Sequence, residues 1–300
     1  MDAKLSLLQW TEGTRGDELV AAARRLESLG YHELWLPEIA GREPLATAGY
    51  LLAKTERLKV SSGIANVYAR DADCAAQAAN ALAEFSGGRF SLGLGVSHPV
   101  LVEPRGHTWV PPVKKMRDYV GRIRNATIES PLADKPAPVI VAGHGPGLVR
   151  VARDLADGSF LFLQPVEAVR MAREILGPDK ELHVTVRCVL DSNPETARDL
   201  ARRACAFYIS LPPYHARWAE LGYEERDWVG GGSDRLIDAI CAWGDAEMLR
   251  AKLGAFAAAG ATHLVLYTCN PGEEYTAGSA VSKGWHWELL EALANCNGGA

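Results

Sequence analysis

The sequence predicts an α/β protein folded as a (β/α)8 barrel, because amphipathic helices alternate with short strands along the chain. In residues 17–37, apolar side chains recur at helical spacing as far as Gly30, and a β-rich segment follows. In residues 245–268, a second helix ends at Gly260 and a strand again follows. Repeats of helix, glycine and strand favour parallel strands joined by right-handed connections.

Eight strands are expected, at residues 5–10, 32–37, 58–64, 89–95, 138–142, 159–163, 182–190 and 262–268. Helices are expected at 19–29, 44–54, 72–85, 146–156 and 245–260. Eight strands in a chain of 300 residues favour a closed barrel over an open, doubly wound sheet. The open sheet is weakened further because no GxGxxG motif follows the first strand.

The whole chain, 1–300, is expected to form one domain, because no Pro-, Gly- or Ser-rich linker divides it. Residues 210–234 depart from the repeat and contain two prolines, four Tyr or Trp residues and three consecutive glycines. This pattern predicts an inserted loop region before the last helix and strand, acting as a lid or as a packed insertion. The aromatic residues favour order, and the glycines provide a candidate hinge.

Composition makes several functions poor candidates. The formal net charge is -5 and no run of Lys or Arg is present, so neither nucleic acid nor a membrane is an expected partner. No segment has the apolar length of a membrane span, and the start of the chain lacks a secretory signal. The six cysteines form no CxxC pair and have no His at metal-ligand spacing. We therefore expect a cytoplasmic protein without a metal site.

A glycine-rich turn, Gly143-His144-Gly145-Pro146, follows the fifth predicted strand and leads directly into a helix. Glycines let backbone N–H groups approach a ligand, and a helix N-terminus attracts anions. The turn is therefore a candidate phosphate site. The alternative is a turn without a ligand.

The segment after the third predicted strand contains Gly63, Ile64, Asn66 and Tyr68. A glycine before a β-branched residue at a strand end suits a bulge that makes room for a ring system. Asn66 and Tyr68 are expected to make polar contacts there. The alternative is a strand that simply ends in a loop.

The segment after the fourth predicted strand places Gly93 and Gly95 on one strand face, which would leave space for a flat cofactor. His98 follows at the expected barrel mouth and titrates near neutral pH. His107 and Trp109 in the same connection are weaker candidates for substrate contacts.

Glu38 directly follows the second predicted strand, at the barrel end where catalytic residues gather. It is a candidate general acid or base. The alternative is an ion pair with Arg42 in a solvated loop.

These segments together resemble the luciferase-like monooxygenase superfamily, and most closely its branch of coenzyme F420-dependent oxidoreductases. The resemblance rests on LWLPEIAGREP (34–44), TERLKVSSGIANVYARD (55–71), GGRFSLGLGVSH (87–98), PVIVAGHGP (138–146) and GGGSDRLIDAICAWGD (230–245).

The resemblance implies a luciferase-like barrel that binds the cofactor phosphate at residues 143–146. It also implies a non-prolyl cis peptide at Gly63-Ile64 and a cofactor-contacting loop at Val96, Ser97 and His98. Many members carry an acid–His pair where this chain has Pro37-Glu38. That departure shifts the expected proton transfer to Glu38 and His98.

The implied reaction is hydride transfer between coenzyme F420, a deazaflavin, and a small organic substrate. The alternatives are an FMN-dependent monooxygenase and a barrel that binds a ligand without turnover. Family members are often homodimers, so a homodimer is expected. The sequence leaves open the substrate and the direction of transfer.

Overall fold

The structure is a computed structural model that describes residues 3–275 and 284–294. Within those residues, eight parallel strands close into a barrel because β10 pairs with both β1 and β8. The predicted barrel is confirmed. Its strands are β1 (Lys4–Leu8), β2 (Glu33–Leu36), β3 (Lys59–Ser62), β5 (Phe90–Gly95), β6 (Val139–Ala142), β7 (Gly158–Phe162), β8 (Glu181–Leu190) and β10 (His263–Thr268).

Two short strands lie outside this ring and were not predicted. β4 (Ala65–Asn66) follows β3 and pairs with the end of β5. β9 (Cys241–Gly244) pairs with the end of β8 and extends the sheet beyond the barrel. β4 has two residues and closely follows β3, and β9 directly follows α11, so no turn signal separates either strand from the element before it.

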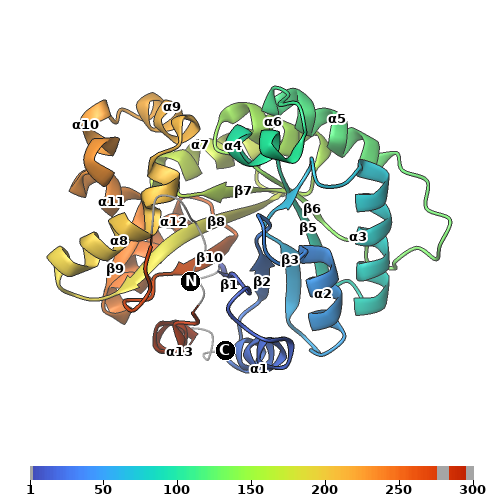
Figure 1. The fold of residues 1–300 in the computed structure, drawn as a ribbon, viewed down its shortest axis with the longest axis horizontal. Coiled ribbons are helices and arrows are strands. Elements are labelled where there is room, and N and C mark those ends of the chain that lie inside the picture. Colours follow the sequence, from blue (N-terminus) through green and yellow to red (C-terminus); the bar gives the residue numbers. More distant parts are fainter. Residues whose placement is uncertain (1–2, 276–283, 295–300) are drawn as a thin grey trace.

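Helices surround the strands (Figure 1). No helix of the described ranges is long and apolar enough to cross a membrane. The helices are α1 (Gly16–Ser28), α2 (Pro44–Leu52), α3 (Ala72–Ser86), α4 (Pro99–Val102), α5 (Pro112–Arg124), α6 (Pro146–Leu155), α7 (Val166–Leu176), α8 (Pro194–Ile209), α9 (Pro212–Glu220), α10 (Glu225–Trp228), α11 (Asp234–Ile240), α12 (Ala246–Ala258) and α13 (Trp287–Ala294).

The insertion at 210–234 is helical, so the expectation of a loop region there is wrong. It forms α9 and α10, followed by a short 3-10 turn at 229–231. Pro212 stands in the first turn of α9, where its missing N–H costs no hydrogen bond. Tyr214 and Trp218 of α9 are fully buried against the chain. Their burial makes this segment a packed insertion, which was the alternative to a lid.

The glycines of β5 are required by close packing inside the barrel. A Cβ atom at Gly93 would lie 2.1 Å from the carbonyl oxygen of Ser62 and 2.7 Å from the Trp35 ring. A Cβ atom at Gly95 would lie 2.4 Å from the Ile64 side chain. The expectation that these positions leave space is therefore wrong at Gly93, where protein atoms fill that space, whereas Gly95 lines the cavity at the strand ends.

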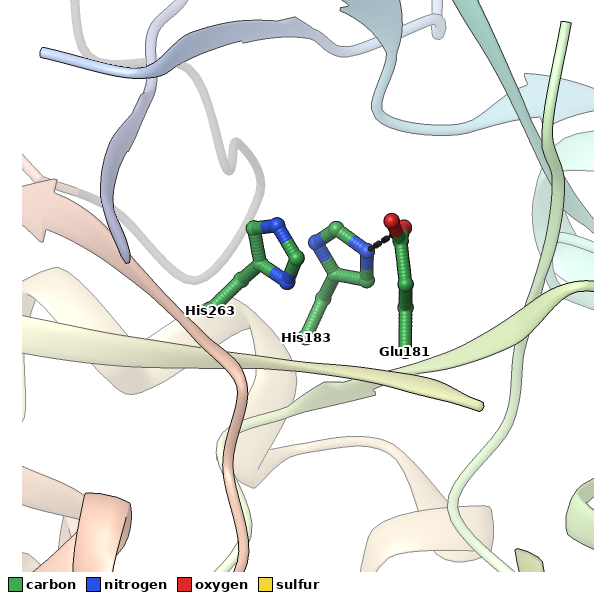
Figure 2. Close-up of side chains that lie close together, drawn as sticks. All are labelled: Glu181, His183 and His263. Carbon is green, nitrogen blue, oxygen red and sulfur yellow. Dashed lines mark hydrogen bonds and ion pairs between the residues drawn. The ribbon is translucent and has the colours of Figure 1, made fainter. Parts of the chain in front are cut away.

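The N-terminal end of the barrel is lined by polar and titratable groups. His183 of β8 and His263 of β10 are adjacent in the strand register, and both are buried. Glu181 lies two residues before His183, on the same face of β8 (Figure 2). Glu33 of β2 is also buried at this end.

Replacing Gly93 with alanine is expected to lower the free energy of unfolding by about 3 kcal/mol, because the new methyl group must displace the backbone of β3. Gly121→Ala is the matched control. A Cβ atom there, inside α5, meets no atom within 4 Å, and alanine favours a helix by about 0.5–1 kcal/mol. Urea unfolding followed by circular dichroism measures both variants. Equal stability of Gly93→Ala and the native protein would contradict the close contact.

Candidate active site

A cavity of about 340 Å³ opens at the C-terminal ends of the barrel strands. Segments that follow β2, β3, β5 and β6 line it, together with α9 of the insertion. Most of the predicted site residues meet here: Glu38, Gly63, Ile64, Val96, Ser97, His98, Trp109, Gly143, His144 and Gly145. Four others, Asn66, Tyr68, His107 and Pro146, are not among its lining residues.

The turn between β6 and α6 has the features of an anion site. A Cβ atom at Gly143 would lie 2.3 Å from the Leu148 side chain, so the tight turn requires glycine. Gly145 caps α6 in an extended conformation, and no atom lies within 4 Å of the place its Cβ would take. The N–H groups of the first helical turn, including those of Gly147 and Leu148, have no acceptor within the helix. They are free to bind an anion.

Arg217 of α9 lines the same cavity and was not predicted from the sequence. Its side chain is buried, and Nη1 donates a hydrogen bond of 2.8 Å to Glu220. Its Nε has no hydrogen-bond partner within the described ranges. A buried guanidinium with an unused donor would gain from an anionic ligand.

His144 belongs to the turn between β6 and α6, and its side chain faces the insertion. Its ring packs 4.4 Å from that of Tyr214, and its Nδ1 is buried without a partner among the described residues. Burial, and to a smaller extent the nearby His98 and Arg217, lowers the pKa of His144 to about 3. The imidazole is therefore neutral at physiological pH and can accept or donate a hydrogen bond.

His98 reaches the cavity from the loop after β5. The preceding Ser97 has a left-handed φ of 61°, a conformation that costs energy for a residue with a side chain. Burial lowers the pKa of His98 to about 4. At neutral pH its imidazole therefore carries one N–H and one free lone pair.

The peptide between Gly63 and Ile64 is cis, as predicted. Both residues line the cavity, and the Ile64 side chain lies against Gly95. Trp10, Phe160 and Phe162 add aromatic surface. The cavity thus combines an apolar wall with a turn that has the features of an anion site.

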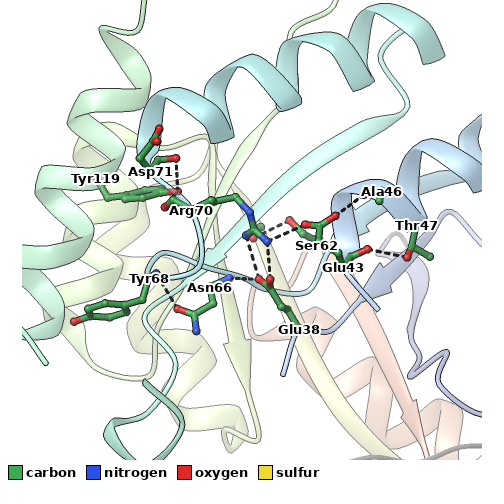
Figure 3. A network of polar contacts seen from close by, with 11 residues as sticks. Glu38, Glu43, Ala46, Thr47, Ser62, Asn66, Tyr68, Arg70, Asp71 and Tyr119 are labelled. Atoms are coloured by element: carbon green, nitrogen blue, oxygen red, sulfur yellow. Dashed lines mark hydrogen bonds and ion pairs between the residues drawn. The ribbon is translucent and has the colours of Figure 1, made fainter. Parts of the chain in front are cut away.

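Glu38 is held by a network of charges (Figure 3). Its Oε1 accepts a 2.6 Å hydrogen bond from Arg70, and its Oε2 accepts one of 2.7 Å from the Asn66 backbone N–H. Arg70 also bonds Glu43 at 2.8 Å. The partner of Glu38 is therefore Arg70, and the alternative of an ion pair with Arg42 is wrong.

Asn66 and Tyr68 are buried and His107 is exposed, and none of the three lines the cavity. The Asn66 side chain accepts a hydrogen bond of 3.0 Å from the Tyr68 backbone. The Tyr68 ring stacks on Trp109 at 5.7 Å and packs 5.9 Å from His107. Through Trp109, which lines the cavity, these residues can set the shape of the site.

Comparison with known protein families identifies the family of this chain. The model of the luciferase-like monooxygenase family matches residues 6–263. The chain belongs to this family. It is an enzyme of a superfamily that contains F420- and FMN-dependent oxidoreductases and monooxygenases.

Two curated relatives of this luciferase-like protein are informative. A 5,10-methylenetetrahydromethanopterin reductase of Archaeoglobus fulgidus is 26% identical over 65% of this chain and 67% of its own length. A Mycobacterium tuberculosis protein, assigned as a coenzyme F420-dependent oxidoreductase, is 25% identical over 88% of this chain and 90% of its own length.

Solved structures share the fold of this luciferase-like protein. The coenzyme F420-dependent tetrahydromethanopterin reductase of Methanopyrus kandleri superposes with a TM-score of 0.75 at 15% identity, over 97% of this chain and 98% of its own. The oxygenating constituent of 3,6-diketocamphane monooxygenase from Pseudomonas putida, in complex with FMN, gives 0.69 at 14% identity, over 98% and 97%.

The ring signals of His98 are expected to stay those of a neutral imidazole as the pH falls from 7 to about 5. The folded pKa of about 4 lies below the ordinary value of 6.5, so protons favour the unfolded state in this interval. Stability should therefore fall as the pH drops from 6.5 towards 4, and His98→Gln should reduce that loss by about 2–3 kcal/mol. NMR titration, with the variant used for assignment, measures the pKa. A midpoint near 6.5 would contradict the burial of the ring.

Proposed function

We propose that this protein is an F420-dependent oxidoreductase that transfers a hydride between the deazaflavin and a small organic substrate. The observation that carries the proposal is the cavity at the barrel mouth. It combines the anion-binding turn at 143–145 with a neutral histidine and an aromatic wall. Phosphate recognition, proton handling and exclusion of water are the tasks that such a reaction gives the protein.

The residues of the cavity fit a phosphate-bearing deazaflavin. Arg217 Nε and His144 Nδ1 are buried without hydrogen-bond partners in the described part of the chain, and each suits a polar ligand atom. The open space beside Gly145 leaves the start of α6 accessible. We assign the cofactor phosphate to Gly143, His144, Gly145 and Pro146, with Arg217 as an added charge.

We assign the ring system to the backbone at Gly63, Ile64, Val96 and Ser97. Glycine and the left-handed Ser97 bring main chain, rather than bulky side chains, to this wall. F420, when bound, donates or accepts a hydride at a ring carbon. Trp109, supported by Tyr68 and His107, is assigned to the substrate side.

His98 is assigned the proton that accompanies hydride transfer. Its neutral imidazole holds a proton on one ring nitrogen and a lone pair on the other. Glu38 already accepts hydrogen bonds on both oxygens. Its contribution is to fix the loop of Asn66 and Arg70 at the cavity wall, so we assign it a positioning role.

F420 is preferred to FMN because the relative assigned as F420-dependent aligns along most of both chains. The FMN-dependent monooxygenase has a similar fold and is the alternative. The proposal also includes a homodimer and a cytoplasmic location, which size-exclusion chromatography and cell fractionation would examine.

Titration of the purified protein with F420 and FMN tests the cofactor. F420 is expected to bind more tightly, and Arg217→Gln should weaken its binding about tenfold or more, because a charged hydrogen bond is lost. Arg226→Gln, at an exposed arginine of the same insertion, is the control and should bind F420 like the native protein. Tighter binding of FMN would favour the monooxygenase, and binding of neither would overturn the assignment of a redox enzyme.

His98→Gln is expected to lower kcat by about 100-fold or more while F420 affinity is retained, since His98 is not assigned to the phosphate. Glu38→Gln should lower kcat less, and the exposed Glu56→Gln serves as its control. Oxidation of reduced F420 by an accepted carbonyl or activated alkene gives the rates. Full turnover in both His98→Gln and Glu38→Gln would remove these assignments.

A further inference from the structure

Three side chains with metal-binding atoms meet at the N-terminal end of the barrel, opposite the cavity at the C-terminal ends of the strands. One ligand atom each of Glu181, His183 and His263 lies within 4.8 Å of the others (Figure 2). The strand register explains the cluster, because His183 and His263 are directly paired on β8 and β10. Neighbours in a parallel pair project to the same side of the sheet.

Hydrogen bonds around His263 can fix its tautomer. The Thr262 hydroxyl accepts a 2.8 Å hydrogen bond from the Leu182 N–H and lies 3.2 Å from the Leu182 carbonyl oxygen, to which it can donate its hydrogen. The same hydroxyl lies 2.9 Å from His263 Nδ1; when it accepts the hydrogen of that nitrogen, Nε2 keeps a lone pair for a cation. The tautomer of a metal-binding histidine is normally fixed by such a bond.

His183 and Glu181 are already close to a ligand geometry. His183 Nε2 lies 2.9 Å from Glu181 Oε2. Tetrahedral metal bonds of about 2.0–2.1 Å imply ligand separations of roughly 3.3 Å. The rings of His183 and His263 are stacked with their centroids 4.1 Å apart, so they would have to tilt towards a cation that replaces the shared proton. The second nitrogen, His183 Nδ1, lies 3.9 Å from Glu33 Oε2, and both atoms lack a hydrogen-bond partner among the described residues. A cation would offset the charge of the buried Glu33 and the partly exposed Glu181.

A route from solvent reaches the cluster. A surface cavity of about 580 Å³ is lined by Glu181, Thr262 and His263 together with Lys4. The Glu181 side chain is 32% exposed, whereas that of His183 is 1% exposed. Glu181 and His263 therefore lie between solvent and the buried imidazole.

We propose that Glu181, His183 and His263 bind one divalent transition-metal ion. Two imidazoles and a carboxylate form a donor set that suits Zn²⁺, Co²⁺ or Ni²⁺ and disfavours Mg²⁺ and Ca²⁺, which prefer oxygen ligands. The ion would join β8 to β10, the pair that closes the barrel. This proposal departs from the expectation of no metal site, and it does not depend on the proposed redox function.

Titration of the full-length protein with Co²⁺, after treatment with a chelator, tests the site. We expect one Co²⁺ per chain, with the visible absorption of a low-coordinate ion, and displacement by Zn²⁺. The melting temperature should rise with bound Zn²⁺. Glu181→Gln and His263→Gln should each weaken binding at least tenfold. Glu195→Gln, at an exposed residue on α8, is the matched control and should bind Co²⁺ like the native protein.

NMR of the native protein keeps the test informative if a variant does not fold. Addition of Zn²⁺ should shift the ring signals of His183 and His263 and leave those of His98 unchanged. Absence of stoichiometric binding would overturn the proposal. Binding that survives both substitutions, or that shifts only histidines elsewhere, would overturn it as well.

Discussion

The pairing of β10 with both β1 and β8 is the constraint on which the rest of the structure depends. Closure brings the ends of all the barrel strands to one rim, so residues more than 100 positions apart, such as Glu38 and His144, line one cavity. An open sheet would leave the first and last strands at separate edges. Closure also forces close packing inside the barrel, where the Trp35 ring lies against Gly93.

The electrostatics of the cavity follow from burial. Burial lowers the pKa of His98, and burial together with the nearby His98 and Arg217 lowers the pKa of His144, so both imidazoles remain neutral at physiological pH. Arg217 uses only part of its hydrogen-bonding capacity within the described ranges. The cavity is thus arranged to receive an anion beside two uncharged imidazoles.

Charged side chains have different partners at the two ends of the barrel. At the C-terminal mouth, Glu38 is balanced by Arg70 in a compact network at the cavity wall. At the N-terminal end, Glu33 and Glu181 both lie near His183, and Glu33 Oε2 and His183 Nδ1 have no hydrogen-bond partner in the described residues. The packed interior separates these two clusters, so a ligand bound at one end of the barrel would not contact a ligand bound at the other.

The sequence by itself determined the repeating order of helix and strand, since hydrophobic spacing and helix-ending glycines are local signals. It also placed the glycine-rich turn at 143–146 and, through a family resemblance, the cis peptide at Gly63-Ile64. Helices α5, α7 and α8, in segments with no predicted element, were found only in the structure, although Asn193 and Pro194 are a usable start signal for α8. Their positions depend on how they pack against their neighbours.

Only the tertiary structure decided which side chains meet. The partner of Glu38 proved to be Arg70 rather than the nearby Arg42, because a loop after β3 folds over the end of β2. Arg217 reaches the cavity only because Tyr214 and Trp218 pack α9 against the barrel. Likewise, His183 and His263 stand 80 residues apart in sequence and become neighbours through strand register. Such contacts are set by pairing and packing over long distances in the chain, for which local sequence patterns carry no signal.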